Sequence, residues 1–468
     1  MTQAVLTSPT LSVHSPYDGR LIGQVQIPDQ ATVERAVTAA HNCRAELAAL
    51  PAHRRASALD SVSSGLSARA EELAQLITAE NGKPLRWART EVTRAAATFR
   101  WAAEEARRWS GELQRLDTDA GSEGRLALVR RVPRGPVLGL TPFNFPLNLV
   151  VHKIAPALAV GCPIVLKPAP ATPLTSLVLG ELLGQTDLPD GAWSVLPVGN
   201  HAAARLVRDP RLPVVSFTGS GPVGWGIRDA VPRKHVTLEL GGNAAVIVAP
   251  DYDDLAWAAQ RIATFAMAQA GQSCVSVQRV LCVAERYDEL RGRVVALVQA
   301  LGTGDPADPT TEVGPLIDTA AAQRVQGWVQ QAVDSGARLL CGGVRDGSSY
   351  TPTVLEDVTA GSRVLDDEVF GPVLVLQRTA TVQEAFDLVN ASRFGLQTGV
   401  FTRDLTLAFR AAHDLDVGGV IIGDVPSYRA DQMPYGGVKD SGRGREGVLS
   451  AMHDLTEQKV LVLTGVTL

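Results

Sequence analysis

Short β-like runs alternate with helical segments along most of this chain, and this alternation limits its possible folds more than any other feature of the sequence. The first series begins at residue 137 and includes apolar runs at 163–166, 193–197 and 213–217. A second series continues over residues 244–420. Because parallel strands need a crossover between them, usually a helix, this order predicts an α/β protein with two doubly wound parallel sheets.

Helices are expected before the first series, and an isolated strand is expected after the second. Residues 31–54, 57–82 and 85–108 carry apolar side chains at three- and four-residue spacing, the period of an amphipathic helix. The runs 126–132 and 459–463 are typical of strands. The last of these has no neighbouring partner in the sequence, so we expect it to pair elsewhere, for example across a subunit boundary.

The composition excludes several classes of protein. A chain of 468 residues exceeds one ordinary core, so two or three domains are expected. Hydrophobic residues make up 45% and charged residues 20%, and the net charge of −5 gives no electrostatic basis for binding nucleic acid or an anionic membrane. No uncharged apolar run reaches the roughly 18 residues of a membrane span, and residues 1–16 lack the regions of a signal peptide.

The cysteines argue against a disulfide framework and against a zinc site. They are odd in number, widely spaced and without a C-x-x-C pair. Their positions are Cys43, Cys162, Cys274, Cys282 and Cys341. We therefore expect a reduced, cytoplasmic enzyme without a metal.

A glycine-rich turn follows the strand-like run 213–217. Residues 217–224 contain the G-x-G-x-x-G pattern, which lets the backbone approach a pyrophosphate at a helix N-terminus, although Pro222 is unusual within it. Glu239 lies about 20 residues further on, where a standard dinucleotide fold carries an acidic residue for the ribose. The alternative role for Glu239 is that of a catalytic base, and the motifs around it favour the base.

Four short motifs together supply the groups needed to oxidise an aldehyde through a covalent thioester. The Gly-Gln-Ser-Cys motif at 271–274 supplies a thiol, and the Pro-Phe-Asn-Phe-Pro motif at 142–146 supplies an amide donor. The Glu-Leu-Gly-Gly-Asn motif at 239–243 supplies a carboxylate base. The Glu-Val-Phe-Gly-Pro motif at 368–372 supplies a candidate cofactor clamp.

With three further motifs this set resembles the NAD(P)-dependent aldehyde dehydrogenase superfamily. The additional motifs are Lys-Pro-Ala at 167–169, Phe-Thr-Gly-Ser at 217–220 and Pro-Tyr-Gly-Gly-Val-Lys at 434–439. The resemblance runs in order from about residue 15 to the C-terminus. On residues 273–279 and 433–447 the chain is most similar to the semialdehyde, lactaldehyde and phosphonoacetaldehyde dehydrogenases.

The resemblance implies three catalytic residues. Cys274 is the expected nucleophile, and the side-chain amide of Asn144, with the backbone N–H of Cys274, is expected to stabilise the alkoxide that its attack creates. Glu239 is the expected base that activates water to hydrolyse the thioester. Acyl-CoA-forming relatives commonly lack this carboxylate, so its presence favours a free acid as product. Cys282 lies in a strand-like run and is expected in the core.

The resemblance also implies NAD(P) as the cofactor. Glu368 and Phe370 match the pair that holds the nicotinamide-side ribose, and Lys167 matches the lysine that reaches the adenosine ribose. Pro170 stands where many NAD-preferring relatives carry a glutamate, so NADP is expected to be tolerated or preferred, although no added Arg or Lys is present to hold its phosphate. The expected cofactor-binding residues are Thr141, Pro142, Phe143, Lys167, Ala169, Gly219, Ser220, Gly224, Leu240, Gly241, Glu368 and Phe370.

Polar residues that map near the aldehyde tunnel of the family predict a small polar or anionic substrate. Arg94, His152 and Arg429 are the main candidates, because Arg binds a carboxylate, phosphonate or sulfonate bidentately. Tyr428 and Ser273 are adjacent candidates, although Ser273 is too small and neutral to act as an anchor. The alternative is that Arg94 is a solvated helix residue and Arg429 an interface residue.

One departure concerns the loop before the Gly-Gly-Val-Lys motif. Gly423 stands where the family usually has an asparagine, and the missing side chain is expected to loosen the loop over the substrate.

The implied architecture has three parts. A dinucleotide-binding domain is expected over 1–118 and 134–240, a catalytic domain over 241–448, and a small β oligomerisation element over 119–133 and 449–468. The expected assembly is a homodimer or a homotetramer. Two alternatives stay open, namely a CoA-acylating aldehyde dehydrogenase and a structural member of the family without catalytic activity.

Overall fold

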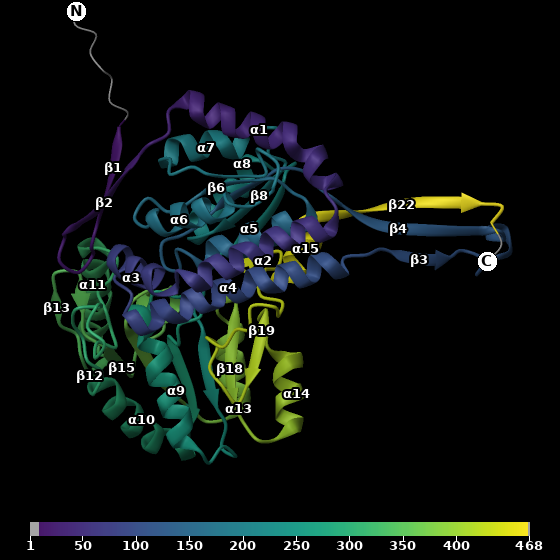
Figure 1. The fold of residues 1–468 in the computed structure, drawn as a ribbon. Coiled ribbons are helices and arrows are strands. Elements are labelled where there is room, and N and C mark those ends of the chain that lie inside the picture. Colours follow the sequence, from purple (N-terminus) through teal and green to yellow (C-terminus); the bar gives the residue numbers. More distant parts are fainter. Residues whose placement is uncertain (1–8, 467–468) are drawn as a thin grey trace, which may run out of the picture.

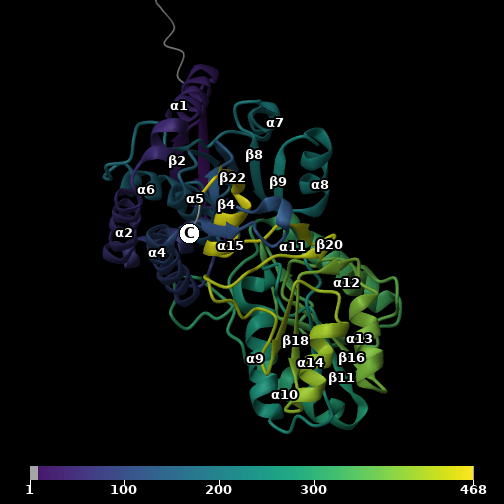
Figure 2. The same cartoon turned by 90° about the vertical axis from the view of Figure 1, so that its right-hand side faces the viewer.

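Two parallel sheets, each covered by helices, and one projecting antiparallel sheet make up the protein (Figures 1 and 2). The computed structural model describes residues 9–466. Residues 1–8, which belong to the segment expected to lack a signal peptide, and residues 467–468, at the end of the expected oligomerisation element, lie outside the described residues. No helix within 9–466 is both long and apolar enough to cross a membrane. The predicted α/β class with two parallel sheets is confirmed.

The first sheet has six strands in the order β21-β9-β8-β5-β6-β7, of which only the edge strand β21 is antiparallel. From β5 the chain winds to β6 and β7 on one side, then returns to β8 and β9 on the other. The winding therefore reverses between β5 and β8, and open α/β sheets bind ligands at the carboxyl ends of the strands at such a point. The strands are β5 Val137–Leu140, β6 Ile164–Lys167, β7 Trp193–Val195, β8 Val214–Thr218, β9 His235–Glu239 and β21 Gly442–Arg443.

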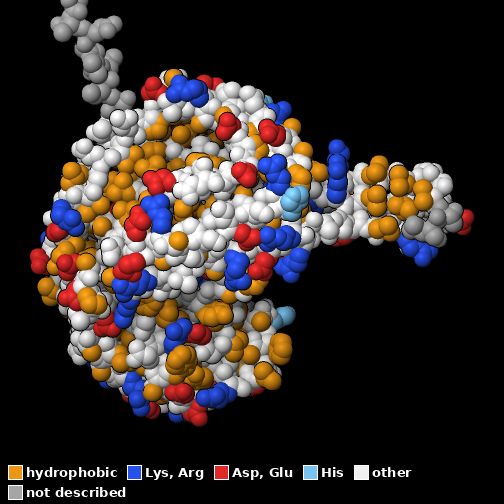
Figure 3. All heavy atoms as spheres, viewed as in Figure 1, with side chains coloured by type: hydrophobic (Ala, Val, Ile, Leu, Met, Phe, Trp, Pro, Cys, Tyr) orange, Lys and Arg blue, Asp and Glu red, His pale blue; other side chains and the backbone are white. Residues whose placement is uncertain are grey.

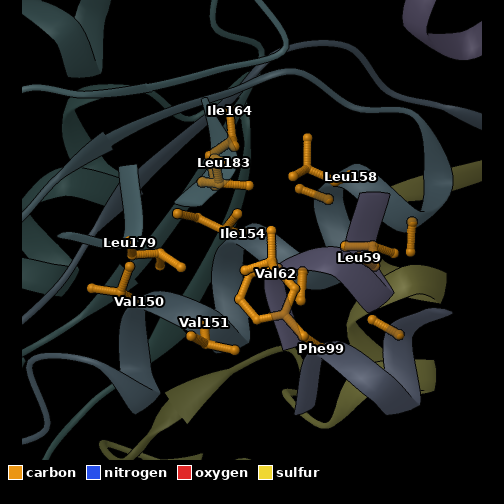
Figure 4. Packing of buried hydrophobic residues seen from close by; sticks show 14 of the residues in the cluster. Leu59, Val62, Phe99, Val150, Val151, Ile154, Leu158, Ile164, Leu179 and Leu183 are labelled. Carbon is orange, nitrogen blue, oxygen red and sulfur yellow. The ribbon is translucent and has the colours of Figure 1, made fainter. Parts of the chain in front are cut away.

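Both faces of this sheet are covered. Ile164 and Leu166 pack against α2, α4, α5 and α6 on one face, whereas Val165 packs against α1 and α7 on the other, as the two-residue period of a strand requires. Figure 4 shows part of the larger cluster, in which Phe99 and Val62 lie against the fully buried helix α5. The helices of this unit are α1 Gln30–Ala49, α2 Ala52–Ala68, α3 Ala70–Asn81, α4 Leu85–Arg108, α5 Asn148–Val160, α6 Leu174–Leu183, α7 Asn200–Arg208, α8 Gly221–Ala230 and α15 Val448–Asp454.

The helix predicted over 57–82 is in fact two helices. The chain turns at Arg69, between α2 and α3, where the Arg69 guanidinium binds Glu72 and reaches Glu181 on α6 at 3.0 Å. Both helices pack on α4 and α6, and α2 also packs on α5. Apolar spacing does not reveal such a break, because each half keeps the helical period.

The second sheet has seven strands in the order β12-β15-β16-β11-β10-β18-β19, with only β12 antiparallel. Its two faces are again covered, by α9, α10 and α11 on one side and by α13 and α14 on the other. The strands are β10 Ala245–Val248, β11 Arg279–Val283, β12 Arg338–Cys341, β15 Thr353–Glu356, β16 Val373–Thr379, β18 Gln397–Phe401 and β19 Gly419–Ile422. The helices are α9 Leu255–Met267, α10 Ala284–Gln299, α11 Thr319–Asp334, α12 Arg363–Asp366, α13 Val382–Asn390 and α14 Leu405–Asp414.

Short elements complete the chain. The N-terminal hairpin is β1 Thr10–His14 and β2 Leu21–Gln26, and two further strand pairs are β13 Arg345–Asp346 with β14 Ser349–Tyr350, and β17 Phe394–Gly395 with β20 Val438–Lys439. The 3-10 turns are Ala120–Ser122 and Ala268–Gly271.

The third sheet projects from the body as an arm of three antiparallel strands (Figure 1). Its strands are β3 Glu112–Arg115, β4 Arg125–Pro133 and β22 Thr456–Thr464. The C-terminal strand, for which the sequence offered no neighbour, pairs with β4 of the same chain from Thr456 to Thr464. The arm begins earlier than residue 119, because β3 pairs with β4, and α15 packs on α5 and α4 instead of joining the arm.

Apolar side chains are concentrated at the surface of the arm (Figure 3). Val460, Leu461 and Val462 of β22 are 50–56% exposed, as is Leu113 of β3 at 53%. An exposed strand edge with such side chains is usually covered by another element or another subunit.

The core of the first unit allows a simple test of its packing. Val62 is 1% exposed between α4 and α5, whereas Val344 is 62% exposed near β13. Val62→Ala should cost roughly 2 kcal/mol of stability, since it removes two buried carbon groups and leaves a cavity. Thermal unfolding should show a midpoint a few degrees below that of the unmodified protein, while the control Val344→Ala should match it. Equal midpoints for both variants would contradict this account of the core.

Candidate active site

The carboxyl ends of the first sheet face the amino ends of the second sheet across one cavity of about 580 Å³. Asn144 follows β5, Ser220 follows β8, and Glu239 ends β9. Cys274 precedes β11 and Glu368 precedes β16. All five side chains line this cavity. Residues that are up to 224 positions apart in the chain thus meet because the two sheets present opposite ends to each other.

The glycine-rich turn leads from β8 into the N-terminus of α8. Ser220 is the N-cap of α8, and Pro222 lies in the first turn of the helix, where a missing N–H costs nothing. A Cβ at Gly219 would lie 2.5 Å from the ring of Phe217, and a Cβ at Gly224 would lie 2.4 Å from Leu240. The glycines therefore allow α8 to sit close to the strand ends, with its free N–H groups at the reversal point of the sheet, and this geometry fits a pyrophosphate.

Two polar groups at the carboxyl ends of β5 and β6, outside the cavity lining, fit the rest of a dinucleotide. The Thr141 hydroxyl, just after β5, is buried without a hydrogen-bond partner among residues 9–466. Lys167 ends β6, is 7% exposed, and has no side-chain hydrogen bond within the same range. Burial lowers the pKa of the Lys167 ammonium. Pro170 is exposed three residues after it, and Ala169 is buried between them.

A second group of predicted cofactor residues closes the cavity from the catalytic side. Glu368 accepts a hydrogen bond from the backbone N–H of Gly242 at 2.9 Å, and burial raises the pKa of this carboxyl to about 7. A Cβ at Gly241 would lie 2.3 Å from the Glu368 carboxylate, so only glycine leaves room for it. Phe370 meets Phe143 edge to face, with ring centroids 5.9 Å apart.

The segment that carries the thiol is held in a strained conformation. Gln269, Ala270 and Gly271 have φ of 53°, 53° and 68°, a run of left-handed residues of which only one is glycine. A Cβ at Gly271 would lie 2.0 Å from the carbonyl oxygen of Gly371. The Gln272 side chain accepts from the N–H of Ile317 at 2.9 Å and so anchors the segment. Strain of this kind persists where packing over-determines the backbone, and it is frequent at functional sites.

The thiol of Cys274 faces the cavity from this segment. Its Sγ lies 3.1 Å from the hydroxyl of Tyr435. Burial raises the pKa of the thiol to about 12; the Tyr435 hydrogen bond lowers it, and the nearby carboxyls of Glu368 and Glu239 raise it.

The Asn144 amide lies across from the thiol segment. Its Nδ2 donates to the backbone carbonyl of Gln272 at 2.9 Å, and its Oδ1 is buried without a partner among the described residues. An amide nitrogen carries two hydrogens, so one N–H remains for a ligand in the cavity.

The pKa values of two buried carboxyls that line the cavity are shifted in opposite directions. Neither oxygen of Glu239 has a hydrogen-bond partner within residues 9–466, and burial together with the charge of Glu446 raises its pKa well above the usual range. Burial alone would also raise the pKa of Glu446, but Lys153 and Arg429 lower it to about 2. Their nitrogens lie 3.4 Å and 3.2 Å from its oxygens. Neighbouring carboxyls whose pKa values are pushed apart are typical of acid–base sites.

Arg429 and Arg94 also line the cavity. The Arg429 guanidinium lies 3.9 Å over the ring of Tyr435, and its Nε is buried without a partner in the described part of the chain. Arg94 binds Asp431 through two nitrogens, at 3.1 Å and 2.7 Å. Ser273 and Tyr428 also line the cavity, and Tyr428 is 49% exposed at its edge.

His152 does not line this cavity, in contrast to the expectation from the sequence. It is 2% exposed on α5, and its Nε2 lies 3.0 Å from Asp431. His152 contacts the same Asp431 carboxylate that Arg94 binds, and its ring nitrogens lie 3.4 Å from Arg429 Nη2. It therefore supports these side chains from outside the cavity. Gly423 also lies outside the cavity lining, and its φ of 75° suits glycine.

Several lining residues were not predicted. Glu446 lines the cavity and pairs with Lys153, which lies outside the lining, and Tyr435 was noted only as part of a motif. Arg261 of α9 lines the cavity, binds Asp424 at 2.7 Å and 2.9 Å, and stacks on the Phe265 ring at 4.3 Å. The only sequence signal for that stacking is the four-residue spacing on one helix.

Comparisons with known proteins agree with the motifs. Residues 5–461 match the aldehyde dehydrogenase family. The chain is 39% identical over 458 residues to 3-sulfolactaldehyde dehydrogenase from Priestia aryabhattai, covering 98% of this chain and 95% of that protein.

Solved structures are similar as well. Aldehyde dehydrogenase 21 from Physcomitrella patens, in complex with the reaction product succinate, superposes with a TM-score of 0.97 at 44% identity, over 99% of this chain and 96% of the other. Glyceraldehyde-3-phosphate dehydrogenase from Methanocaldococcus jannaschii, complexed with NADP, superposes with a TM-score of 0.93 at 34% identity, over 98% of this chain and 100% of the other.

Proposed function

The chain belongs to the aldehyde dehydrogenase family, and from that premise we propose that it oxidises a small anionic aldehyde to the free acid with NAD(P)+ and water. One observation carries the choice of substrate: the Arg429 side chain lines the cavity that contains the Cys274 thiol, and its buried Nε has no hydrogen-bond partner within residues 9–466. An unpaired buried donor is costly unless a ligand completes it, and an anion is the partner that a guanidinium binds best. The similar proteins solved with succinate or named for sulfolactaldehyde support the same class.

The first step is attack by Cys274. The thiol passes its proton to water and becomes a thiolate, whose Sγ bonds to the carbonyl carbon while the carbonyl oxygen takes the electron pair. The spare N–H of Asn144 and the backbone N–H of Cys274 stabilise the negative oxygen.

The residues that hold the cofactor come from both units. The N-terminus of α8 takes the pyrophosphate, Lys167 takes the adenosine ribose, and Glu368 with Phe370 takes the other ribose. The chemistry that NAD(P)+ supplies when bound is acceptance of the hydride from the carbon attached to Sγ, which leaves a thioester. Gly241 leaves room for the Glu368 carboxylate, and the left-handed turn at 269–271 leads into Cys274.

Glu239 completes the reaction. It takes a proton from water, the water oxygen attacks the thioester carbon, the C–S bond breaks, and Cys274 leaves as the thiolate. Its raised pKa makes the deprotonated carboxylate a stronger base than an ordinary glutamate. A base reserved for water favours hydrolysis over transfer of the acyl group to CoA.

The remaining assignments concern assembly and location. The six-stranded unit is the dinucleotide-binding domain, expected over residues 1–118 and 134–240, except that β3 lies in the arm and that β21 and α15 join this unit. The seven-stranded unit is the catalytic domain, expected over residues 241–448. The arm is the element through which the chain forms a homodimer or homotetramer, and its exposed apolar strand β22 supports this role. All five cysteines are free thiols, which supports a reducing, cytoplasmic location.

Substrate choice can be tested on aldehydes of equal length. Arg429→Leu should lower kcat/KM about ten- to a hundredfold for a four-carbon aldehyde with a terminal carboxylate, since a charge-assisted hydrogen bond contributes roughly 1.5–3 kcal/mol. The same variant should retain its activity on butanal, which serves as the internal control. Equal losses on both aldehydes would show that Arg429 only supports the fold, and a preference of the unmodified enzyme for butanal would refute the anionic subsite.

The base can be tested by separating acylation from hydrolysis. Glu239→Gln should release one burst of reduced cofactor per active site and then stall as an acyl-enzyme detectable by mass spectrometry. In the unmodified enzyme the hydrolysis rate should rise with pH through the raised pKa of Glu239, because the carboxyl must lose its proton to act. Cys274→Ala is the control and should give no burst. A full turnover rate in Glu239→Gln would assign the base elsewhere.

Cofactor preference can be tested at the end of β6. Pro170→Glu should shift the ratio of kcat/KM values towards NAD, because the added carboxylate repels a 2′-phosphate and accepts from a 2′-hydroxyl. Pro170→Gln is the matched control without the charge and should shift the ratio less. An unchanged ratio in both variants would mean that residue 170 does not approach the ribose.

A further inference from the structure

Tyr435 belongs to a motif that the proposed reaction leaves without a role. It is 5% exposed, and its ring packs against Val275 and Leu396 beside the thiol. Its backbone N–H donates to the carbonyl of Glu446 at 3.0 Å, and its carbonyl accepts from the N–H of Glu446 at 2.6 Å. The Arg429 guanidinium covers the ring at 3.9 Å. Contacts with the backbone, the ring edge and the ring face of Tyr435 therefore fix the position of its phenol.

The hydroxyl of this phenol lies next to the reacting atom, Cys274 Sγ. Its oxygen lies 3.1 Å from Cys274 Sγ, and among residues 9–466 neither atom has another hydrogen-bonding partner. A phenylalanine would fill the same space. The hydroxyl is thus the feature of this side chain that packing does not explain.

We propose that Tyr435 is a further catalytic residue, whose hydroxyl donates a hydrogen bond to the Cys274 thiolate and holds Sγ in position for attack. The proposal rests on Cys274 being the nucleophile. It adds a group that acts on the nucleophile itself, whereas Asn144 acts on the substrate oxygen and Glu239 on water.

The direction of the hydrogen bond follows from the surroundings. Burial raises the pKa of the phenol well above its usual range, so the hydroxyl keeps its proton and donates it. The carboxyls of Glu368 and Glu239 raise the pKa of the Cys274 thiol, whereas Arg429, which lies over the Tyr435 ring, lowers it. No cation is hydrogen-bonded to Sγ within the described residues, so the hydroxyl is the group that stabilises the thiolate directly.

This hydrogen bond affects two steps, the attack of the thiolate on the aldehyde and its release during hydrolysis. A neutral thioester sulfur is a poor acceptor, so the hydroxyl stabilises the thiolate before attack and again when it leaves during hydrolysis. It should affect rates rather than substrate affinity, because Arg429 keeps its ring to stack on in Tyr435→Phe.

The test measures the reactivity of the thiol without substrate. Iodoacetamide alkylates the thiolate, forming an S–C bond as iodide leaves, and peptide mass spectrometry reports the label on Cys274 separately from the other cysteines. Tyr435→Phe should lower the alkylation rate of Cys274 at least about tenfold at each pH from 7 to 9, as expected for losing a hydrogen bond to a charged group. Tyr350→Phe, which removes the hydroxyl of another buried tyrosine outside the cavity, is the matched control and should react like the unmodified enzyme.

Steady-state and burst kinetics complete the test. Tyr435→Phe should slow the burst of reduced cofactor and lower kcat, with KM for the anionic aldehyde, binding of NADPH and the thermal midpoint unchanged. Alkylation as fast as in the unmodified enzyme, or faster, would overturn the proposal while leaving the nucleophile in place. Full activity in Cys274→Ala would instead refute the proposed function, so the two failures are distinguishable.

Discussion

The site depends on one buried carboxylate, Glu446, and on the two cations that keep it charged. Lys153 reaches it from α5 and Arg429 from the loop before Tyr435, so the ion cluster joins the first unit to the C-terminal segment. Its negative charge raises the pKa of Glu239, and its backbone holds Tyr435 beside Cys274. Burying an ion pair seldom increases stability, because desolvation offsets the attraction, so this cluster is better explained by the positions it imposes.

The opposed ends of the two sheets explain why the site can combine binding and chemistry. The first sheet offers the carboxyl ends of its strands and the N-terminus of α8, a polar edge suited to a nucleotide. The second sheet presents the amino ends of its strands, and the strained turn at 269–271 precedes Cys274, which lines the cavity between the two edges. Gly242 and Gly271 allow the backbone to approach the carbonyl oxygens of Cys274 and Gly371 at distances that a Cβ would prevent.

Sequence reasoning succeeded where the pattern was local and failed where side chains meet across the fold. The alternation of strands and helices predicted two parallel sheets, and the motifs predicted groups that line one cavity. The break at Arg69 was missed, because it depends on contacts with distant segments. The resemblance placed residues 119–133 and 449–468 in one β element, and β22 pairs with β4 there, although periodicity alone gave the last strand no partner. His152 was expected in the tunnel, yet the direction of its side chain is set by how α5 lies on Asp431.

By itself the sequence determined the type of fold, the thiol, the amide and the carboxylates, since these follow from periodicity and from short motifs whose chemistry is local. Only the tertiary structure decided which of them carry charge and which have a free donor. Glu239 and Glu446 are identical side chains in the sequence, yet burial and the charge of Glu446 raise the pKa of Glu239, whereas close contacts with Lys153 and Arg429 lower the pKa of Glu446. Desolvation and Coulomb energies depend on distances in space, and no spacing along the chain encodes them.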